Sequence, residues 1–218
     1  QFNKTYFSNS FLNKYLTFKK GDLYNIDALN KTQENFKLSP YFAQAIIIPQ
    51  TRDKKNNTIP IRANLSPLPK RRYTIGLGYD NQNKVYLTGT LYNNHLQKDG
   101  VQLKSTLQIS SPEKNIFTEL TLPSNTSPNT YYSLSTGFSR IKRPNGRSTA
   151  AKGIFSKKII YPQGNINLSI NILKERYRYS NLPKTTSNMI YPSFQSNYRK
   201  ADKINNITQS GYAINTNI

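Results

Sequence analysis

The chain has 218 residues, no cysteine and a formal net charge of +21, from 31 Lys and Arg against 10 Asp and Glu. The lack of cysteine excludes disulfides and thiolate metal sites. Mean hydropathy is -0.70, and no apolar run approaches the ~20 residues of a transmembrane helix, which excludes a helical membrane protein. A transmembrane β-barrel is not excluded, because its strands alternate apolar and polar residues.

The first part of the chain, residues 1–68, predicts a mixed α/β unit. An apolar face at residues 11–16 predicts a short helix, with Ser8 or Ser10 as its N-cap. Gly21 is expected to end this helix, because glycine readily adopts the left-handed conformation of a C-terminal cap.

The same unit continues with a second helix and two strands. The helix is expected over residues 27–38, with Asp27 as its N-cap. Strands follow at residues 41–49 and 59–65, separated by a polar turn at residues 53–57. A unit of this order normally has another strand before its first helix, and only Phe2 and its neighbours remain of one. The N-terminus is therefore expected to be truncated.

The second part of the chain, residues 72–218, alternates apolar and polar residues with a period of two, which predicts strands without helices. Nine strands are expected, at residues 73–79, 85–91, 101–109, 115–122, 131–138, 151–161, 165–172, 189–198 and 212–218. A soluble sandwich shares this alternation. Strand lengths near those that cross a bilayer, and Tyr and Phe near strand ends, favour a membrane barrel. Because bacterial barrels close with an even number of strands, nine strands predict an incomplete barrel.

Several segments together resemble the TamA-like outer-membrane assembly factors of the BamA/TamA superfamily. The stretch FLNKYLTFKKGDLY at residues 11–24 resembles a POTRA-domain signature, and LSPYFAQAIIIPQ at residues 38–50 resembles the helix-to-strand passage of that domain. IPI through LSP, at residues 59–67, is similar to its closing strand. YTIGLGY at residues 73–79 resembles a first barrel strand, and LQISSPE at residues 107–113 an early barrel segment. Order and spacing agree across about residues 2–122, and more loosely to residue 218.

The resemblance implies a fold and a function. Residues 1–68 would form an α+β POTRA domain (βααββ, with a truncated first strand) in the periplasm. Residues 72–218 would form the N-terminal part of an antiparallel transmembrane β-barrel in the outer membrane. The implied role is assembly or translocation of autotransporter-type clients. The implied partners are outer-membrane lipid or lipopolysaccharide, unfolded outer-membrane proteins and a TamB-like inner-membrane protein. The family's late R-G-Y/F motif and closing strand have no counterpart here.

Two sets of strand residues are candidate pairing sites for an extended client, since an exposed strand edge binds through main-chain hydrogen bonds. The seam strand of the barrel would comprise Tyr73, Thr74, Ile75, Gly76, Leu77, Gly78 and Tyr79. The POTRA edge strands would contribute Ala43, Ile46, Ile48, Ile59 and Ile61. The alternative is structural: an ordinary barrel strand in the first case, and completion of a small core by residues 46–48 in the second.

The sequence predicts no enzyme, cofactor or metal site. His95 is the only histidine and is expected in a solvated loop or strand end. No G-x-S-x-G motif occurs. The charge of +21 fits a polyanion partner or a compositional bias toward Lys, Asn and Ile, and its spread along the chain argues against nucleic acid. Two other classes stay open: a two-partner-secretion transporter, and a soluble basic β-rich protein that binds a polyanion.

Overall fold

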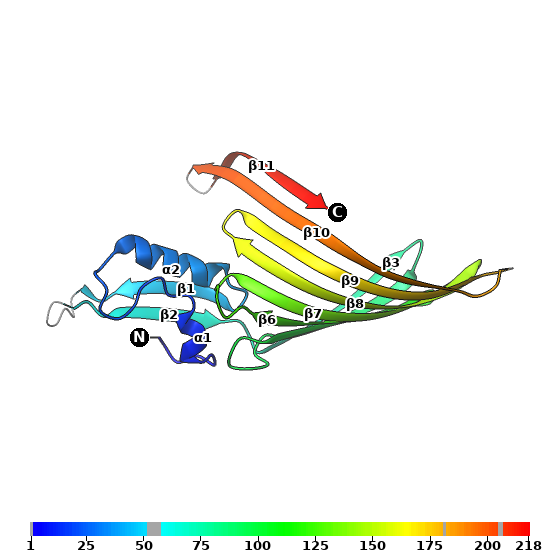
Figure 1. Cartoon of the computed structure of the whole chain (residues 1–218), viewed down its shortest axis with the longest axis horizontal. Coiled ribbons are helices and arrows are strands. Elements are labelled where there is room, and N and C mark those ends of the chain that lie inside the picture. Colours follow the sequence, from blue (N-terminus) through cyan, green and yellow to red (C-terminus); the bar gives the residue numbers. More distant parts are fainter. Residues whose placement is uncertain (1, 52–57, 181, 205–206) are drawn as a thin grey trace.

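The computed structural model describes residues 2–51, 58–180, 182–204 and 207–218, and consists mainly of β-strands. A small α/β unit lies at one end of a long, curved antiparallel sheet (Figure 1). The predicted turn at residues 53–57 lies outside the described residues. No helix in the described part of the chain is long and apolar enough to cross a membrane.

Helix α1 (Asn9–Asn13) opens the α/β unit. Its N-cap is Ser8, one of the two residues predicted for this position, and the Ser8 hydroxyl accepts a hydrogen bond from the Phe11 amide at 3.2 Å. The helix ends at Asn13, so the expected end at Gly21 is wrong. Beyond the helix, Thr17 contacts the second helix by donating from its hydroxyl to the Ala28 carbonyl at 2.6 Å. Gly21 lies further on with a φ of 97°.

Helix α2 (Ile26–Leu38) packs against the strands that follow it. Its N-cap is Asn25, not Asp27 as predicted, because the Asn25 side-chain oxygen accepts from the Asp27 amide at 2.8 Å. Asp27 instead lies in the first turn, where a carboxylate stabilises the positive end of the helix dipole. Phe36 faces inward and is fully buried in a cluster of aromatic side chains.

Strands β1 (Phe42–Pro49) and β2 (Ile61–Pro67) form a two-stranded antiparallel sheet. Ala45 opposite Leu65 lies on the face that α2 covers, and both are buried. Phe2 forms an isolated parallel bridge with Ala63, on the side of β2 away from β1.

The described residues of the second part of the chain form a nine-stranded antiparallel sheet, in agreement with the nine strands predicted. Each strand pairs with the next along the chain, from β3 at one edge to β11 at the other. The sheet is not closed within the described residues. Its strands are β3 (Arg71–Asp80), β4 (Lys84–Asn93), β5 (Gln102–Ser110), β6 (Glu113–Pro123), β7 (Thr130–Arg143), β8 (Gly146–Tyr161), β9 (Gly164–Tyr179), β10 (Thr185–Ile204) and β11 (Ile207–Asn217).

Strands β7 to β10 are longer than predicted, at 14, 16, 16 and 20 residues. The apolar alternation that marks β9 stops at Ile172, yet the strand continues to Tyr179. Its ladder to β8 continues through Arg178, opposite Arg147, without an apolar face. Main-chain hydrogen bonds propagate the ladder regardless of side-chain type, so the apolar pattern underestimates these strands.

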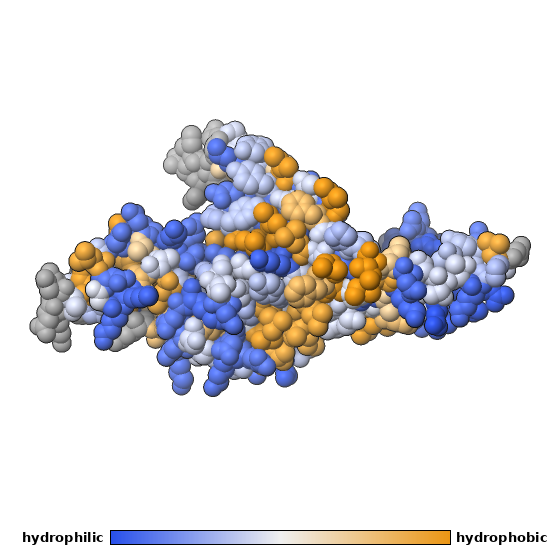
Figure 2. Space-filling model, viewed as in Figure 1, coloured by the Kyte–Doolittle hydropathy of each residue, from blue (hydrophilic) through white to orange (hydrophobic). Residues whose placement is uncertain are grey.

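The two faces of the sheet differ in composition and crowding. One row across β7, β8 and β9 contains Leu134, Phe155 and Ile170, which are 59%, 53% and 54% exposed. The neighbouring row on the opposite face contains Ser156 and Ser169, which are buried and joined by a 3.0 Å hydrogen bond. The crowded polar face is therefore the concave one, and the convex face is an exposed apolar band (Figure 2). An apolar exterior over a polar interior is typical of a transmembrane β-barrel.

Candidate functional site

Strand β3, the predicted seam strand, is an edge of the sheet. Among the described residues its one strand partner is β4, so its other side presents unpaired main-chain groups. Its convex face is apolar and exposed: Tyr73 66%, Ile75 80%, Leu77 77% and Tyr79 67%. The edge thus combines free hydrogen-bonding capacity with four large apolar side chains.

The concave side of β3 contains Thr74, Gly76 and Gly78, and the two glycines make room for side chains of β4. Gly78 lies directly opposite Tyr86, whose ring covers it. A Cβ at Gly78 would lie 2.4 Å from the Tyr86 Cζ atom, and a Cβ at Gly76 would lie 2.8 Å from the Thr88 hydroxyl oxygen. A larger side chain at either position would therefore have to displace Thr88 or Tyr86 of β4, in addition to any effect on the open edge.

Strand β1 is the more open edge of the α/β unit, but α2 partly occupies it. The Gln33 side-chain oxygen accepts a hydrogen bond from the Ile47 amide at 3.0 Å. Ala43 lies at a register shift, with neither flanking ladder pair including it. Ile46 and Ile48 are 40% and 37% exposed, so the expectation that residues 46–48 complete the core is wrong for these two. Ile47 alone of the three packs against the core.

The β2 edge is covered over part of its length. The Asn3 side chain accepts from the Leu65 amide and donates to the Leu65 carbonyl, both at 2.9 Å, as a neighbouring strand would. Ile59, predicted as a strand residue, precedes β2, while Ile61 is its first residue. Pro60 between them has no amide hydrogen for a ladder, which explains the later start.

The α/β unit is fixed to the near end of the sheet, a joint that the sequence did not predict. The Tyr41 hydroxyl donates to the Gly100 carbonyl at 2.7 Å, and the Ser8 amide donates to the Lys98 carbonyl at 3.0 Å. Tyr131 at the start of β7 belongs to the same buried aromatic cluster as Tyr41. Only residues 68–70 connect β2 to β3. The one signal in the sequence was the Lys98-Asp99-Gly100 turn, whose glycine has a φ of 83°.

His95 belongs to this joint, so its prediction as a solvated residue is wrong. It is 5% exposed, stacks on Tyr6 at 5.3 Å and meets the edge of Phe7 at 4.8 Å between ring centroids. Its Nε2 atom has no hydrogen-bond partner among the residues that the structure describes. Burial, and secondarily the charge of Lys70, lowers the pKa of His95 below its ordinary value of 6.5. The neutral form is therefore favoured in the folded protein.

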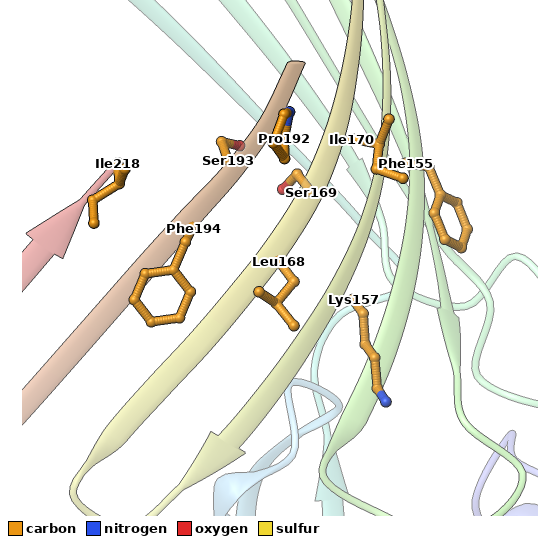
Figure 3. A pocket seen from close by; sticks show the side chains of 9 residues that line it. All are labelled: Phe155, Lys157, Leu168, Ser169, Ile170, Pro192, Ser193, Phe194 and Ile218. Carbon is orange, nitrogen blue, oxygen red and sulfur yellow. The ribbon is translucent and has the colours of Figure 1, made fainter. Parts of the chain in front are cut away.

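A shallow hollow of about 390 Å³ lies on the sheet where β8, β9 and β10 meet the last residue (Figure 3). Most of its lining is apolar, including Phe155, Leu168, Ile170, Phe194 and Ile218. No His, Asp or Glu lines it. The described residues contain no group of three or more His, Cys, Asp or Glu that could hold a metal ion.

No protein-family model and no curated protein matches this chain. Solved structures match its fold at low sequence identity. BamA from Haemophilus ducreyi lacking POTRA domains 1–3 matches 91% of the chain with a TM-score of 0.69 at 10% identity. CdiB from Acinetobacter baumannii matches 99% with a TM-score of 0.55 at 13% identity, and CdiB from Escherichia coli matches 91% with a TM-score of 0.54 at 15% identity. The chain spans 43%, 50% and 40% of these three chains. It therefore shares the fold of part of the BamA and CdiB structures.

Proposed function

We propose that this chain is the POTRA-and-early-barrel part of an outer-membrane factor that assembles or translocates autotransporter-type clients. The observation that carries the proposal is the apolar, exposed edge strand β3, joined by residues 68–70 to an α/β unit with the βααββ order of a POTRA domain. The matches to BamA and CdiB cover more of the chain than the sheet alone, which supports including the α/β unit. This unit would lie in the periplasm and the sheet in the outer membrane.

The mechanism is strand pairing, without catalysis or a cofactor. An extended client segment adds to the free side of β3 through main-chain hydrogen bonds, which accept many client sequences. The side chains of Ile75 and Leu77 lie on the convex face, where an incoming strand places its own apolar residues toward lipid. The edge of β1 is a second pairing site once Gln33 releases the Ile47 amide. A TamB-like inner-membrane protein is the proposed partner on the periplasmic side.

A two-partner-secretion transporter is the second candidate. Two of the solved structures named above are CdiB proteins, and the one from Acinetobacter baumannii covers 99% of the chain, which favours this class. The two candidates differ in the fate of the client, which stays in the membrane in the first and leaves the cell in the second.

The first experiment is fractionation of the native protein, followed by gel electrophoresis with and without boiling. Recovery in the outer membrane with a folded band that shifts on boiling supports the barrel. Recovery as a water-soluble protein without a shift overturns it, and leaves a basic polyanion-binding protein as the explanation.

The second experiment tests β3 itself. The double variant Gly76→Val, Gly78→Val in the native protein should impair display of an autotransporter client, because both valines clash with side chains of β4 and displace the seam strand β3. Gly89→Val with Gly153→Val is the matched control, since a Cβ at either position meets no atom within 4 Å. Normal display by the seam variant, at a normal level of folded protein, contradicts a seam role for β3.

A further inference from the structure

A compact group of cations lies on the convex face, at the end of the sheet far from the α/β unit. We define the convex cationic patch as Arg140 and Lys142 of β7, Arg147 of β8, and Lys174, Arg176 and Arg178 of β9. All six side chains are exposed. They share the convex face because they continue the alternation of Phe138 on β7 and of Ile172 on β9.

The strand register brings these charges side by side. Lys142 lies opposite Arg147, which lies opposite Arg178 on the next strand. In the adjacent row, Arg140 and Arg176 flank Thr149, and Lys114 of β6 lies opposite Arg140. Like charges directly opposite each other destabilise a sheet. The arrangement is therefore unfavourable unless an anion neutralises it.

No described carboxylate lies beside the patch on this face. The glutamates of the described sheet, Glu113, Glu119 and Glu175, lie on the concave face by strand alternation. Glu175 accepts a hydrogen bond there from the Ser148 hydroxyl. The patch thus presents cations alone to whatever surrounds the convex face.

The position of the convex cationic patch relative to the apolar band indicates which part of a bilayer the patch would contact. Along β9, the convex side chains are Ile166, Leu168, Ile170 and Ile172, and the cationic residues begin at Lys174. Figure 2 shows the apolar band giving way to hydrophilic side chains at the end remote from the α/β unit. With the band in the hydrocarbon layer, the patch lies at the level of the lipid headgroups of the leaflet facing away from the α/β unit.

We infer that the convex cationic patch binds the phosphate groups of an anionic glycolipid in that leaflet, of the bis-phosphorylated lipid A type. The inference rests on the proposed function, because it requires the apolar band to lie in a membrane. Arginine predominates in the patch, and its planar guanidinium group binds phosphate oxygens through two parallel hydrogen bonds. Acyl chains of the same lipid lie against Leu168, Ile170 and Ile172 below.

The test measures binding of lipid A to the full chain folded in detergent micelles. The variant Arg140→Gln, Arg176→Gln, Arg178→Gln should raise the half-saturating lipid A concentration about tenfold, which corresponds to ~1.4 kcal/mol. The control is Arg62→Gln, Arg143→Gln, Arg199→Gln, which removes the same charges from the α/β unit and from residues off the convex face, and should change binding by less than about twofold. Boiling-dependent gel mobility shows that each variant is folded.

The probes separate the sources of phosphate. The glycolipid is supported if the protein binds lipid A more tightly than it binds phosphatidylglycerol or inorganic phosphate at equal phosphate concentration. Equal binding of either probe overturns that assignment, and so does equal binding of lipid A by the patch variant and the wild type. A chain that does not insert into bilayers overturns the proposed function and the patch together, whereas insertion with unchanged lipid A binding overturns the patch alone.

Discussion

The Tyr41 hydroxyl donates a 2.7 Å hydrogen bond to the Gly100 carbonyl, across 59 positions of sequence. Tyr41 directly precedes β1, and Gly100 lies in the turn between β4 and β5. Both ends of the bond are buried in the aromatic cluster, where burial also raises the pKa of Tyr41 above its ordinary value. One hydrogen bond therefore joins the α/β unit to a turn of the sheet.

Tyr41→Phe should loosen this joint. Removing the hydroxyl leaves the Gly100 carbonyl without its partner in a buried place, at a cost of about 1–3 kcal/mol. Limited proteolysis should then cut residues 68–70 faster than in the wild type. Tyr131→Phe is the control, because the Tyr131 hydroxyl donates to the Pro128 carbonyl within its own loop. Equal cleavage of wild type and Tyr41→Phe would show that the bond does not hold the joint.

The packing of Gly78 under Tyr86 predicts a strong coupling between the two positions. Gly78→Val should destabilise the folded chain by about 1–3 kcal/mol, because the Tyr86 ring has to move. In Tyr86→Ala the same valine finds space, so the double variant should lose much less than the sum of the two single changes. Thermal unfolding in detergent micelles, followed by gel mobility, measures all four proteins. Additive losses would contradict the contact.

Gln33→Ala should expose the edge of β1. The Ile47 amide loses its acceptor, so its hydrogen exchange in the folded protein should accelerate at least about tenfold, equivalent to ~1.4 kcal/mol of protection. A strand-forming peptide should also bind the variant more tightly, because Gln33 no longer competes for that amide. The control is Gln44→Ala, which changes an exposed glutamine on β1 itself. Unchanged hydrogen exchange at the Ile47 amide would show that Gln33 does not protect this edge of β1.

His95 predicts a pH dependence of the joint. Its lowered pKa means that the unfolded chain binds a proton more readily, so stability is lost as pH falls from about 6.5 toward the folded-state pKa. His95→Phe keeps the stacking on Tyr6 and removes both the titration and the unpartnered Nε2 atom. The difference in melting temperature between wild type and variant should grow from pH 8 to pH 5. A difference that is constant with pH would contradict the assignment.

The sequence predicted the elements better than their contacts. Alternation identified all nine strands of the sheet, because each carries at least some apolar residues at a period of two. The helix caps were harder, since Asn25 and Asp27 are both good caps and only the local geometry selects Asn25.

Long-range contacts lay beyond sequence reasoning. His95 is buried by Tyr6 and Phe7, almost ninety positions away, and nothing near His95 in the chain indicates this. The packing of Gly78 under Tyr86 depends on the register between β3 and β4, which the alternation leaves undetermined. The charge of +21 could be read from composition, but the gathering of six cations on one face of β7 to β9 required the register of three strands.

Because the connection between β2 and β3 is short, a force on the α/β unit is transmitted to the edge strand of the sheet. Three residues span at most about 10 Å, and the Leu68 amide is also bonded to the Tyr41 carbonyl at 2.8 Å, so the connection has little slack. Tension applied to β1 by a bound chain would pass through Tyr41 and β2 directly into the first residues of β3. Pulling on the α/β unit would therefore peel β3 from β4 starting at Arg71, one residue pair at a time, instead of shearing the whole strand at once.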